Sequence, residues 1–197
     1  MSKLGLVICA SMLWAQTAHA TVAIELSGPE LAAVSDVIVH ARVVSVGGHV
    51  QLNPLRVFTD AELDVIEGVK GVAPGQRIHV TFPGGVHNGL GMYVSGQVAL
   101  TADQECVIFL SRTSDGRYFP SAMRQGYFAV QKRDYDGVRL GVKNTSGLAL
   151  MQRHGPSQTL NEIPQRLVRP LGQVLEEIRA DVKTSASIDP KSIIGGR

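Results

Sequence analysis

Apolar and polar side chains alternate along the middle of the chain, with the period of a β-strand. Within residues 58–71, apolar side chains at every second position are separated by carboxylates: Ala61, Leu63 and Val65 against Asp60, Glu62 and Asp64. Successive side chains of a strand point to opposite faces, so the pattern predicts a strand with one buried and one wet face. A helix is the alternative, because Ala and Glu favour it, but Gly68 and Gly71 would interrupt a helix.

Two neighbouring segments carry the same signal. Residues 77–82 alternate between an inward and an outward set: Ile78, Val80 and Phe82 against Arg77, His79 and Thr81. Residues 37–46 are rich in β-branched residues and predict a strand with one apolar face and one mixed face. If these strands pair, Arg42, Arg77 and His79 face Glu62 and Asp64 across a polar sheet surface, each pair contributing a few tenths of a kcal/mol.

More short strands follow, and together they predict the fold class. The run "CVIFLSR" at 106–112 predicts a strand buried on both faces, and a hairpin is expected around Asp136-Gly137. Weaker strands are expected at 116–123, 125–132 and 138–142. Short strands joined by glycine-rich turns favour a barrel or a sandwich over a parallel-sheet fold.

Helices are predicted only near the two ends of the domain. Ser27, Pro29 and Glu30 stand in the order of a capping box and predict a short helix over 29–33. Behind Pro170, apolar residues recur at helical spacing: Leu171, Val174, Leu175, Ile178 and Val182. This amphipathic helix is expected to cover the sheet, and binding to a partner is the alternative. Residues 184–197 show no pattern and are predicted to be a mobile tail.

The first twenty residues have the order of a secretory signal peptide. Lys3 precedes an apolar run over residues 4–14, which is too short to span a bilayer, and Ala18-His19-Ala20 forms a cleavage site. We expect cleavage before Thr21, giving an exported protein of one domain, periplasmic or secreted, without a membrane span. Loss of Lys3 lowers the formal charge from +2 to +1, which offers no electrostatic attraction for nucleic acid.

The glycine-rich stretch "TFPGGVHNGLGMYVSG" at 81–96 raises the question of a phosphate loop. It lacks the G-x-x-x-x-G-K-[ST] spacing, and no helical pattern follows it. We therefore predict an irregular connection in which glycines supply turns. Loops often carry binding residues, so His87, Asn88 and Tyr93 are candidate ligand contacts, with His87 the most exposed histidine. Arg42, Arg77 and His79 on the polar strand face are the other candidates.

Signals for catalysis, a metal or a cofactor are missing, so none is assigned. Ser95 lacks the first glycine of a nucleophile elbow, and no H-E-x-x-H motif is present. Cys106, the one cysteine that remains after cleavage, lies in an apolar run. We therefore predict that its thiol is buried and inert. Histidines on different strands can still converge on a metal, and His40 and His79 are the first pair to check.

The motifs "SDVIVHARVVSV", "FTDAELDVIEGVKG", "RIHVTFPGG", "ECVIFLSR" and "RQGYFAV", in this order over residues 35–130, resemble a family of exported bacterial proteins of unassigned function. Cys106 departs from the family pattern. The helix, the long strand and the "VIEGVKG" strand are also distantly similar to the netrin-like module of tissue metalloprotease inhibitors. That resemblance implies a five-stranded barrel and protein binding. With the strand pattern, we expect a mainly β domain over residues 21–183, a five- to seven-stranded OB-like barrel. Inhibition does not carry over, because the inhibitors' cysteines have no counterpart.

The favoured hypothesis is an exported, non-enzymatic module that binds a protein or an envelope component. The alternative from another class is a small exported hydrolase, metal-assisted through His40, His79 and His87. A third hypothesis is a structural domain of a larger envelope assembly, which docks on a neighbour through its C-terminal helix.

Overall fold

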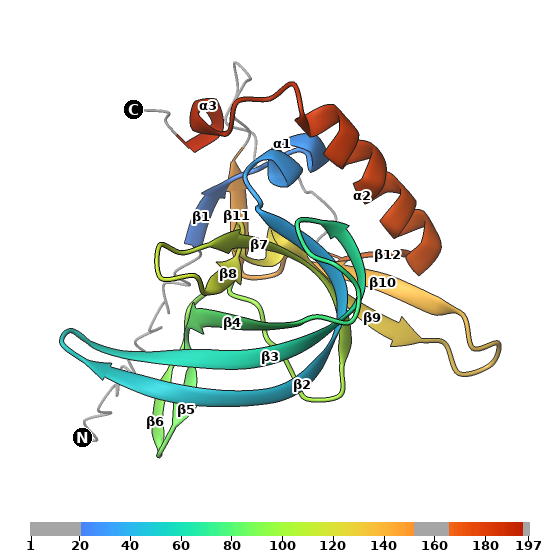
Figure 1. The fold of residues 1–197 in the computed structure, drawn as a ribbon. Helices are drawn as coiled ribbons and strands as arrows, with labels where there is room; N and C mark the ends of the chain where they lie inside the picture. The colour runs from blue at the N-terminus through green and yellow to red at the C-terminus, as the bar shows by residue number, and fades with distance from the viewer. Residues whose placement is uncertain (1–20, 152–165, 195–197) are drawn as a thin grey trace, which may run out of the picture.

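The computed structural model describes residues 21–151 and 166–194 and has a mainly β fold, as predicted (Figure 1). Its main sheet has eight strands in the order β12-β10-β9-β7-β2-β3-β4-β8. These strands are β2 (Val37–Leu52), β3 (Leu55–Lys70), β4 (Arg77–Pro83), β7 (Glu105–Arg112), β8 (Tyr118–Pro120), β9 (Tyr127–Lys132), β10 (Arg139–Asn144) and β12 (Arg166–Pro170). The predicted signal peptide lies outside the described residues.

Two small sheets and four helical segments complete the fold. Strand β1 (Thr21–Ile24) pairs in parallel with β11 (Leu148–Met151), and β5 (Gly85–His87) forms a hairpin with β6 (Leu90–Met92). The helical segments are α1 (Gly28–Ala33), the 3-10 turn η1 (Met123–Gly126), α2 (Leu171–Ser185) and α3 (Pro190–Ile194). None of the helices in the described ranges is long and apolar enough to cross a bilayer.

Five strands of the main sheet form a circuit of pairings. Strand β7 pairs with β2, β2 with β3, and β3 with β4, while β8 pairs with both β4 and β7. The link between β4 and β8 is a single parallel bridge between Val80 and Tyr118. A β-barrel needs such a closed circuit of paired strands. Here the circuit is closed only by the single bridge between β4 and β8. The OB-like name stays a prediction.

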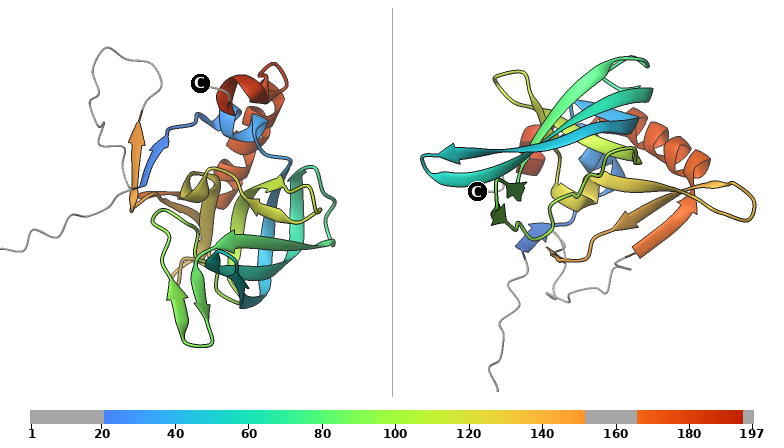
Figure 2. Two further views of the ribbon diagram at one scale, coloured as in Figure 1. Left: turned by 90° about the vertical axis from the view of Figure 1, so that its left-hand side faces the viewer. Right: turned by 90° about the horizontal axis from the view of Figure 1, so that it is seen from below.

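Buried and outward-facing side chains alternate along β3 and β4, as predicted. Ala61, Leu63 and Val65 are buried, and Ile78, Val80 and Phe82 face the same core. Strand β7 is buried on both faces from Cys106 to Leu110. Strand β2 is longer than predicted, because Gly47 and Gly48 do not end it: they pair with Asp60 and Thr59 of β3. The β2–β3 ladder therefore continues into a long projecting arm (Figure 2).

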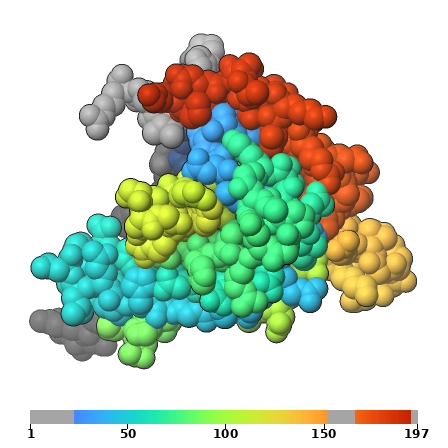
Figure 3. Space-filling model, in the orientation of Figure 1, coloured from blue at the N-terminus to red at the C-terminus, as the bar shows by residue number. Residues whose placement is uncertain are grey.

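Two apolar clusters lie on opposite sides of the sheet. One fills the circuit and includes Val39, Leu63 and Ile108. The other lies under the helices, where residues of β2, β7 and β9 meet α1 and the apolar stripe of α2: Ile38, Val107, Phe109, Phe128, Leu31, Leu171, Val174, Leu175 and Ile178. Helix α2 thus covers the sheet as predicted, and Figure 3 shows it along the top of the molecule.

The two ends of the domain differ in how well the sequence predicted them. Ser27 and Glu30 form the predicted capping box of α1, with Ser27 N donating to Glu30 Oε2 at 2.9 Å. No element was predicted after residue 183, yet α2 runs to Ser185 and α3 follows. Asp189 accepts a hydrogen bond from Lys191 N at 2.9 Å, and Ile193 is buried, which explains why this short segment forms a helix.

Candidate binding surfaces

The outward face of β2, β3 and β4 carries the predicted polar surface in three cross-strand rows. Asp64 of β3 stands between Arg42 and Arg77, and Glu62 stands beside His79. The pleat places these residues on one face because they lie at every second position of β3 and β4. Asp60 and Thr81 form the third row, opposite Gly47.

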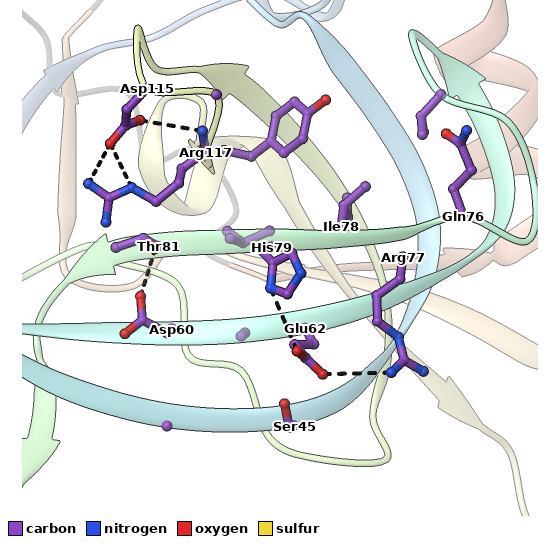
Figure 4. Close-up of a pocket in the computed structure, with 16 residues that line it drawn as sticks. Ser45, Asp60, Glu62, Gln76, Arg77, Ile78, His79, Thr81, Asp115 and Arg117 are labelled. Atoms are coloured by element: carbon purple, nitrogen blue, oxygen red, sulfur yellow. Dashed lines mark hydrogen bonds and ion pairs between the residues drawn. The ribbon is translucent and has the colours of Figure 1, made fainter.

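Arg77 and His79 make the predicted contacts with acidic residues of β3, and Figure 4 shows both beside Glu62. Arg77 donates two hydrogen bonds to the Asp64 carboxylate, at 2.7 and 3.0 Å, and this pairing lowers the pKa of Asp64. Glu62 lies 3.7 Å from both Arg77 Nη1 and His79 Nδ1. The side chains are about half exposed, so these pairs add little to stability.

Arg42 lies opposite Asp64 in the β2–β3 register, as predicted, but its side chain forms its ion pair with another strand. Its guanidinium donates to Glu105 Oε1 of β7 at 2.8 Å, because β7 lies on the other side of β2 and sets Glu105 directly beside Arg42. His40 Nε2 and Arg139 Nη1 also contact Glu105, at 3.2 and 3.5 Å. Burial by itself would raise the pKa of Glu105, but the hydrogen bonds from Arg42 and His40 outweigh it and lower the pKa.

A second polar cluster on this face was not predicted from the sequence. Asp60 accepts a hydrogen bond from Thr81 Oγ1 at 2.7 Å and another from His49 Nδ1. The His49 ring stacks on Phe58, with centroids 5.3 Å apart. His49 lies on the part of β2 beyond the two glycines, which the sequence pattern had excluded from the strand.

A groove of about 860 Å³ runs beside β4, which we call the strand-edge groove. One wall is β4 with the polar rows, and the other is the turn before β8, which carries Asp115 and Arg117 (Figure 4). Arg117 Nε donates to Asp115 Oδ2 at 2.8 Å. This hydrogen bond and one from Thr113 lower the pKa of Asp115 to about 2. The sequence singled out Arg77 and His79 but not this opposite wall.

The glycine-rich stretch forms the β5–β6 hairpin, whereas an irregular connection was predicted. Asn88 and Gly89 form its two-residue turn with φ of 47° and 79°. Asn-Gly between two strands is a strong hairpin signal, so the sequence did contain this feature. Asn88 Nδ2 lies 3.1 Å from His87 Nε2 at the tip of the hairpin. Tyr93, just after β6, is 84% exposed.

The hairpin is held against the β2–β3 arm by two hydrogen bonds at Gly84. Thr59 Oγ1 donates to the carbonyl oxygen of Gly84 at 2.7 Å, and Gly84 N donates to the carbonyl oxygen of Val57 at 2.8 Å. A Cβ atom on Gly85 would lie 2.3 Å from Thr59 Oγ1, so any other residue here would force the two segments to shift. Glycine is thus favoured here by packing as well as by its φ of 117°.

Large apolar side chains gather on these two projecting segments, and we call this set the hairpin surface. Val86, Leu90 and Tyr93 lie on or beside the β5–β6 hairpin, while Leu52 and Leu55 lie at the tip of the arm, and all five are exposed. A hollow of about 690 Å³ lies at the base of the hairpin and is lined mainly by glycine and apolar residues. Val86 and Tyr93 border this hollow, whereas His87 and Asn88 do not.

The three histidines of the hydrolase hypothesis lie in different settings. His40 is buried against Glu105, whereas His79 is 66% exposed on the polar face. His87 is only partly exposed, so the prediction that it is the most exposed histidine is wrong. Residues 21–151 and 166–194 contain no group of three histidine, cysteine or carboxylate side chains placed to bind a metal.

Ser95 and Cys106 have structural roles in the fold. Ser95 Oγ donates to the carbonyl oxygen of Gly147 at 2.6 Å, which ties the segment after β6 to the turn before β11. Cys106 is a free, fully buried thiol, as predicted. Burial, with a smaller effect of the Glu105 charge, raises the pKa of Cys106 to about 12, so the thiol stays protonated at neutral pH.

Comparison of the sequence with models of known protein families finds no match, and comparison with curated proteins likewise finds none. The two surfaces described above are therefore interpreted from their own geometry.

Proposed function

We propose that this protein is an exported, non-enzymatic binding module that contacts a protein or an envelope component through the hairpin surface. One observation supports this proposal above all: five large apolar side chains are exposed on two adjacent projecting segments. Two of them, Val86 and Tyr93, border the hollow at the base of the hairpin, and exposed apolar residues beside a hollow are typical of interaction sites. Tyr93 adds a rigid ring with a polar tip, a residue type enriched in protein interfaces.

The hairpin surface is also built to keep its shape. Close contacts at Gly84 and Gly85 fix the hairpin on the arm, so binding requires little ordering of the chain. A preorganised surface keeps more of the contact free energy as affinity. The polar face carries charged groups that already pair with one another, which supports the hairpin surface as the main contact.

The test is partner capture with two matched variants. The protein from Thr21 onwards is immobilised and exposed to envelope and culture fractions of its own source, and bound proteins are identified by mass spectrometry. Tyr93→Ser should abolish capture of a specific partner. Tyr135→Ser is the control, because Tyr135 is 80% exposed but lies between β9 and β10, away from the hairpin surface. Capture that survives Tyr93→Ser, or that both variants abolish, would contradict the proposal.

Export is tested separately from binding. The protein is isolated from the envelope and culture fractions of its source, and the mass of its N-terminal peptide is determined. A mature chain that begins at Thr21 supports the proposal. A chain that keeps residues 1–20 in the cytoplasmic fraction contradicts it, whatever the capture experiment gives.

A further inference from the structure

We propose that the strand-edge groove binds a neutral, extended peptide, which adds to the open edge of β4. This second site does not depend on the hairpin surface. The first observation is the weak seam of the sheet. Within the described residues, the outer side of β4 pairs with another strand only where Val80 meets Tyr118. Unpaired strand edges are templates for pairing with an additional chain.

The unpaired main-chain groups can be assigned to particular residues. The carbonyl oxygen of Gln76 accepts from Val65 N of β3 at 2.9 Å, so it points towards β3. Main-chain groups of successive residues in a strand point to opposite sides. The N–H and C=O groups of Arg77, and those of His79, therefore point to the outer edge, into the groove. The parallel bridge at Val80 uses the C=O group of His79 and the N–H group of Thr81, because the groups of Val80 itself point to β3. The N–H and C=O groups of Arg77 and the N–H group of His79 stay open.

The groove offers apolar contacts as well as hydrogen bonds. Ile78, Val80 and Tyr118 line it with the small part of their surface that the core leaves exposed, and Val72 and Gln76 line it as well. In Figure 4, Ile78 and Gln76 lie on the side of β4 away from Glu62. A peptide strand beside β4 would place alternate side chains over these residues and the others towards solvent. The inward residues of the peptide are therefore expected to be apolar and small to medium in size.

The charged side chains around the groove favour a neutral peptide, because they already pair with one another. Arg77 already donates two hydrogen bonds to Asp64, and Arg117 forms an ion pair with Asp115 at 2.7 Å. A charged peptide side chain would have to compete with an existing partner in either case. The main-chain groups of β4, in contrast, can be satisfied by any extended chain.

The probe is a panel of hexapeptides, acetylated and amidated at their ends, that alternate serine with alanine, valine or leucine. Binding to the ¹⁵N-labelled mature protein is followed by NMR. At least one member should shift the Arg77 and His79 amide signals downfield and leave that of Tyr93 unchanged. Failure of the whole panel to bind in the millimolar range overturns the proposal, as does binding that leaves both β4 amides unaffected.

A peptide control separates main-chain pairing from contact with side chains. The best hexapeptide is remade with an N-methyl group on each amide that faces β4, which keeps its side chains. Its affinity should fall at least about tenfold, because those hydrogen bonds cannot form. Equal affinity of the methylated peptide overturns strand addition. This control needs no change to the protein and holds even if a variant fails to fold.

A matched pair of protein variants tests the same point from the other side. His79→Pro removes the outward N–H group, and proline is tolerated on an edge strand when its nitrogen faces outwards. His79→Ala removes the same ring and keeps the N–H group. The alanine variant should bind within about twofold of the wild type, and the proline variant should lose most of its affinity. Loss in both variants, each folded by circular dichroism, would assign binding to the imidazole and overturn the proposal.

A second copy of the chain is the competing occupant of this edge. Without peptide, hydrogen exchange of the Arg77 and His79 amides should not change with protein concentration. Protection that rises with concentration, together with a dimer in sedimentation, would show that β4 pairs with another copy and would overturn the peptide proposal. Tyr93→Ser should leave peptide binding unchanged, so failure of the hairpin surface and failure of the groove are distinguishable.

Discussion

The β2–β3 ladder has a proximal half and a distal half, which differ sharply in how far their side chains are buried by other elements. In the proximal half, Val37–Val43 of β2 lies between the two apolar clusters, and only Arg42 is exposed in this stretch. In the distal half, Gly47–Leu52 of β2 has no buried residue. One antiparallel pairing runs through both halves, with register shifts between Ile38 and Ser45 and none from Ser45 onwards.

This contrast shows that hydrogen bonding does not by itself decide what a strand pair contributes. Both halves form ladder hydrogen bonds, whose net contribution per bond is modest. The proximal half adds apolar burial, which dominates folding free energy. The distal half is supported by the β5–β6 hairpin and buries Val57, but keeps Leu52 and Leu55 at its tip exposed. We therefore expect stability to depend on the proximal half and partner binding on the distal half.

The largest effect is expected from removing core volume in the proximal half. Leu63→Ala should lower the free energy of unfolding by about 3 kcal/mol, because Leu63 is fully buried and leaves a cavity. Leu55→Ala in the distal half is the matched control and should cost less than about 0.5 kcal/mol, because Leu55 is 64% exposed. Urea unfolding of both variants measures this difference. Similar costs for the two leucines would contradict the division into halves.

A smaller effect is expected at Glu105, which binds His40 and Arg42 of the proximal half. Glu105→Gln should cost about 2 kcal/mol at pH 7, because a charged acceptor shared by several donors becomes neutral. The folded state lowers the pKa of Glu105, so its contribution is present above the unfolded pKa and is lost as pH falls through the folded pKa.

The pH dependence provides the check on Glu105. The difference in stability between the wild type and Glu105→Gln is measured by urea unfolding at pH 7 and at about pH 3. It should be smaller at the acid pH, where the wild-type carboxylate becomes protonated. A difference that stays constant or grows would show that the glutamate acts through its shape and not through its charge.

The distal half should respond locally to a change at its contact with the hairpin. Gly85→Ala places a Cβ atom against Thr59 in a left-handed backbone, and should cost about 1 to 2 kcal/mol in local opening. Gly47→Ala is the control, because no atom lies within 4 Å of its added Cβ atom. Hydrogen exchange of the arm amides should accelerate in the first variant only. Unchanged exchange in both would show that the hairpin does not support the arm.

The smallest effect on stability is expected in the wall of the strand-edge groove, where charges are exposed. Arg117→Gln should raise the pKa of Asp115 from about 2 towards 3.8, because the arginine is the main cause of its depression. Any stability from this pair is present above pH 3.8 and lost as pH falls through about 2.

An NMR titration of the side-chain carboxyl groups measures the Asp115 shift directly. Arg77→Gln is the matched control: it should raise the pKa of Asp64 and leave that of Asp115 unchanged. An unchanged pKa of Asp115 in Arg117→Gln would show that this wall of the groove is not held by the ion pair.

The strand faces could be predicted because their cause is local. Alternation placed Leu63 inside and Glu62 outside, and helical spacing placed Val174 and Ile178 under α2. The extent of β2 could not be predicted in this way, because Gly47 and Gly48 end strands in many sequences. Here they continue the strand because β3 pairs with them and β5 crosses beside them. The Asn88-Gly89 turn was predictable and was missed.

Within the candidate sites, the sequence predicted which polar residues lie on the outward face better than it predicted which residues they form ion pairs with. Arg77 and His79 face Glu62, as their positions on adjacent strands predict. Arg42 pairs instead with Glu105, which is 63 positions away in the chain. The partner of a strand residue depends on which strand lies on each side of it, and no local pattern contains that order.

The sequence by itself determined which face of each strand and helix is buried, because side-chain direction follows from a period of two or 3.6 residues. It also determined that Cys106 is an inert thiol, because its neighbours are apolar. Only the tertiary structure decided that β4 keeps an open edge and that Leu52, Leu55 and Tyr93 stand exposed on adjacent projections. These features depend on the order and register of strands distant in the chain, which are fixed only when the whole sheet forms.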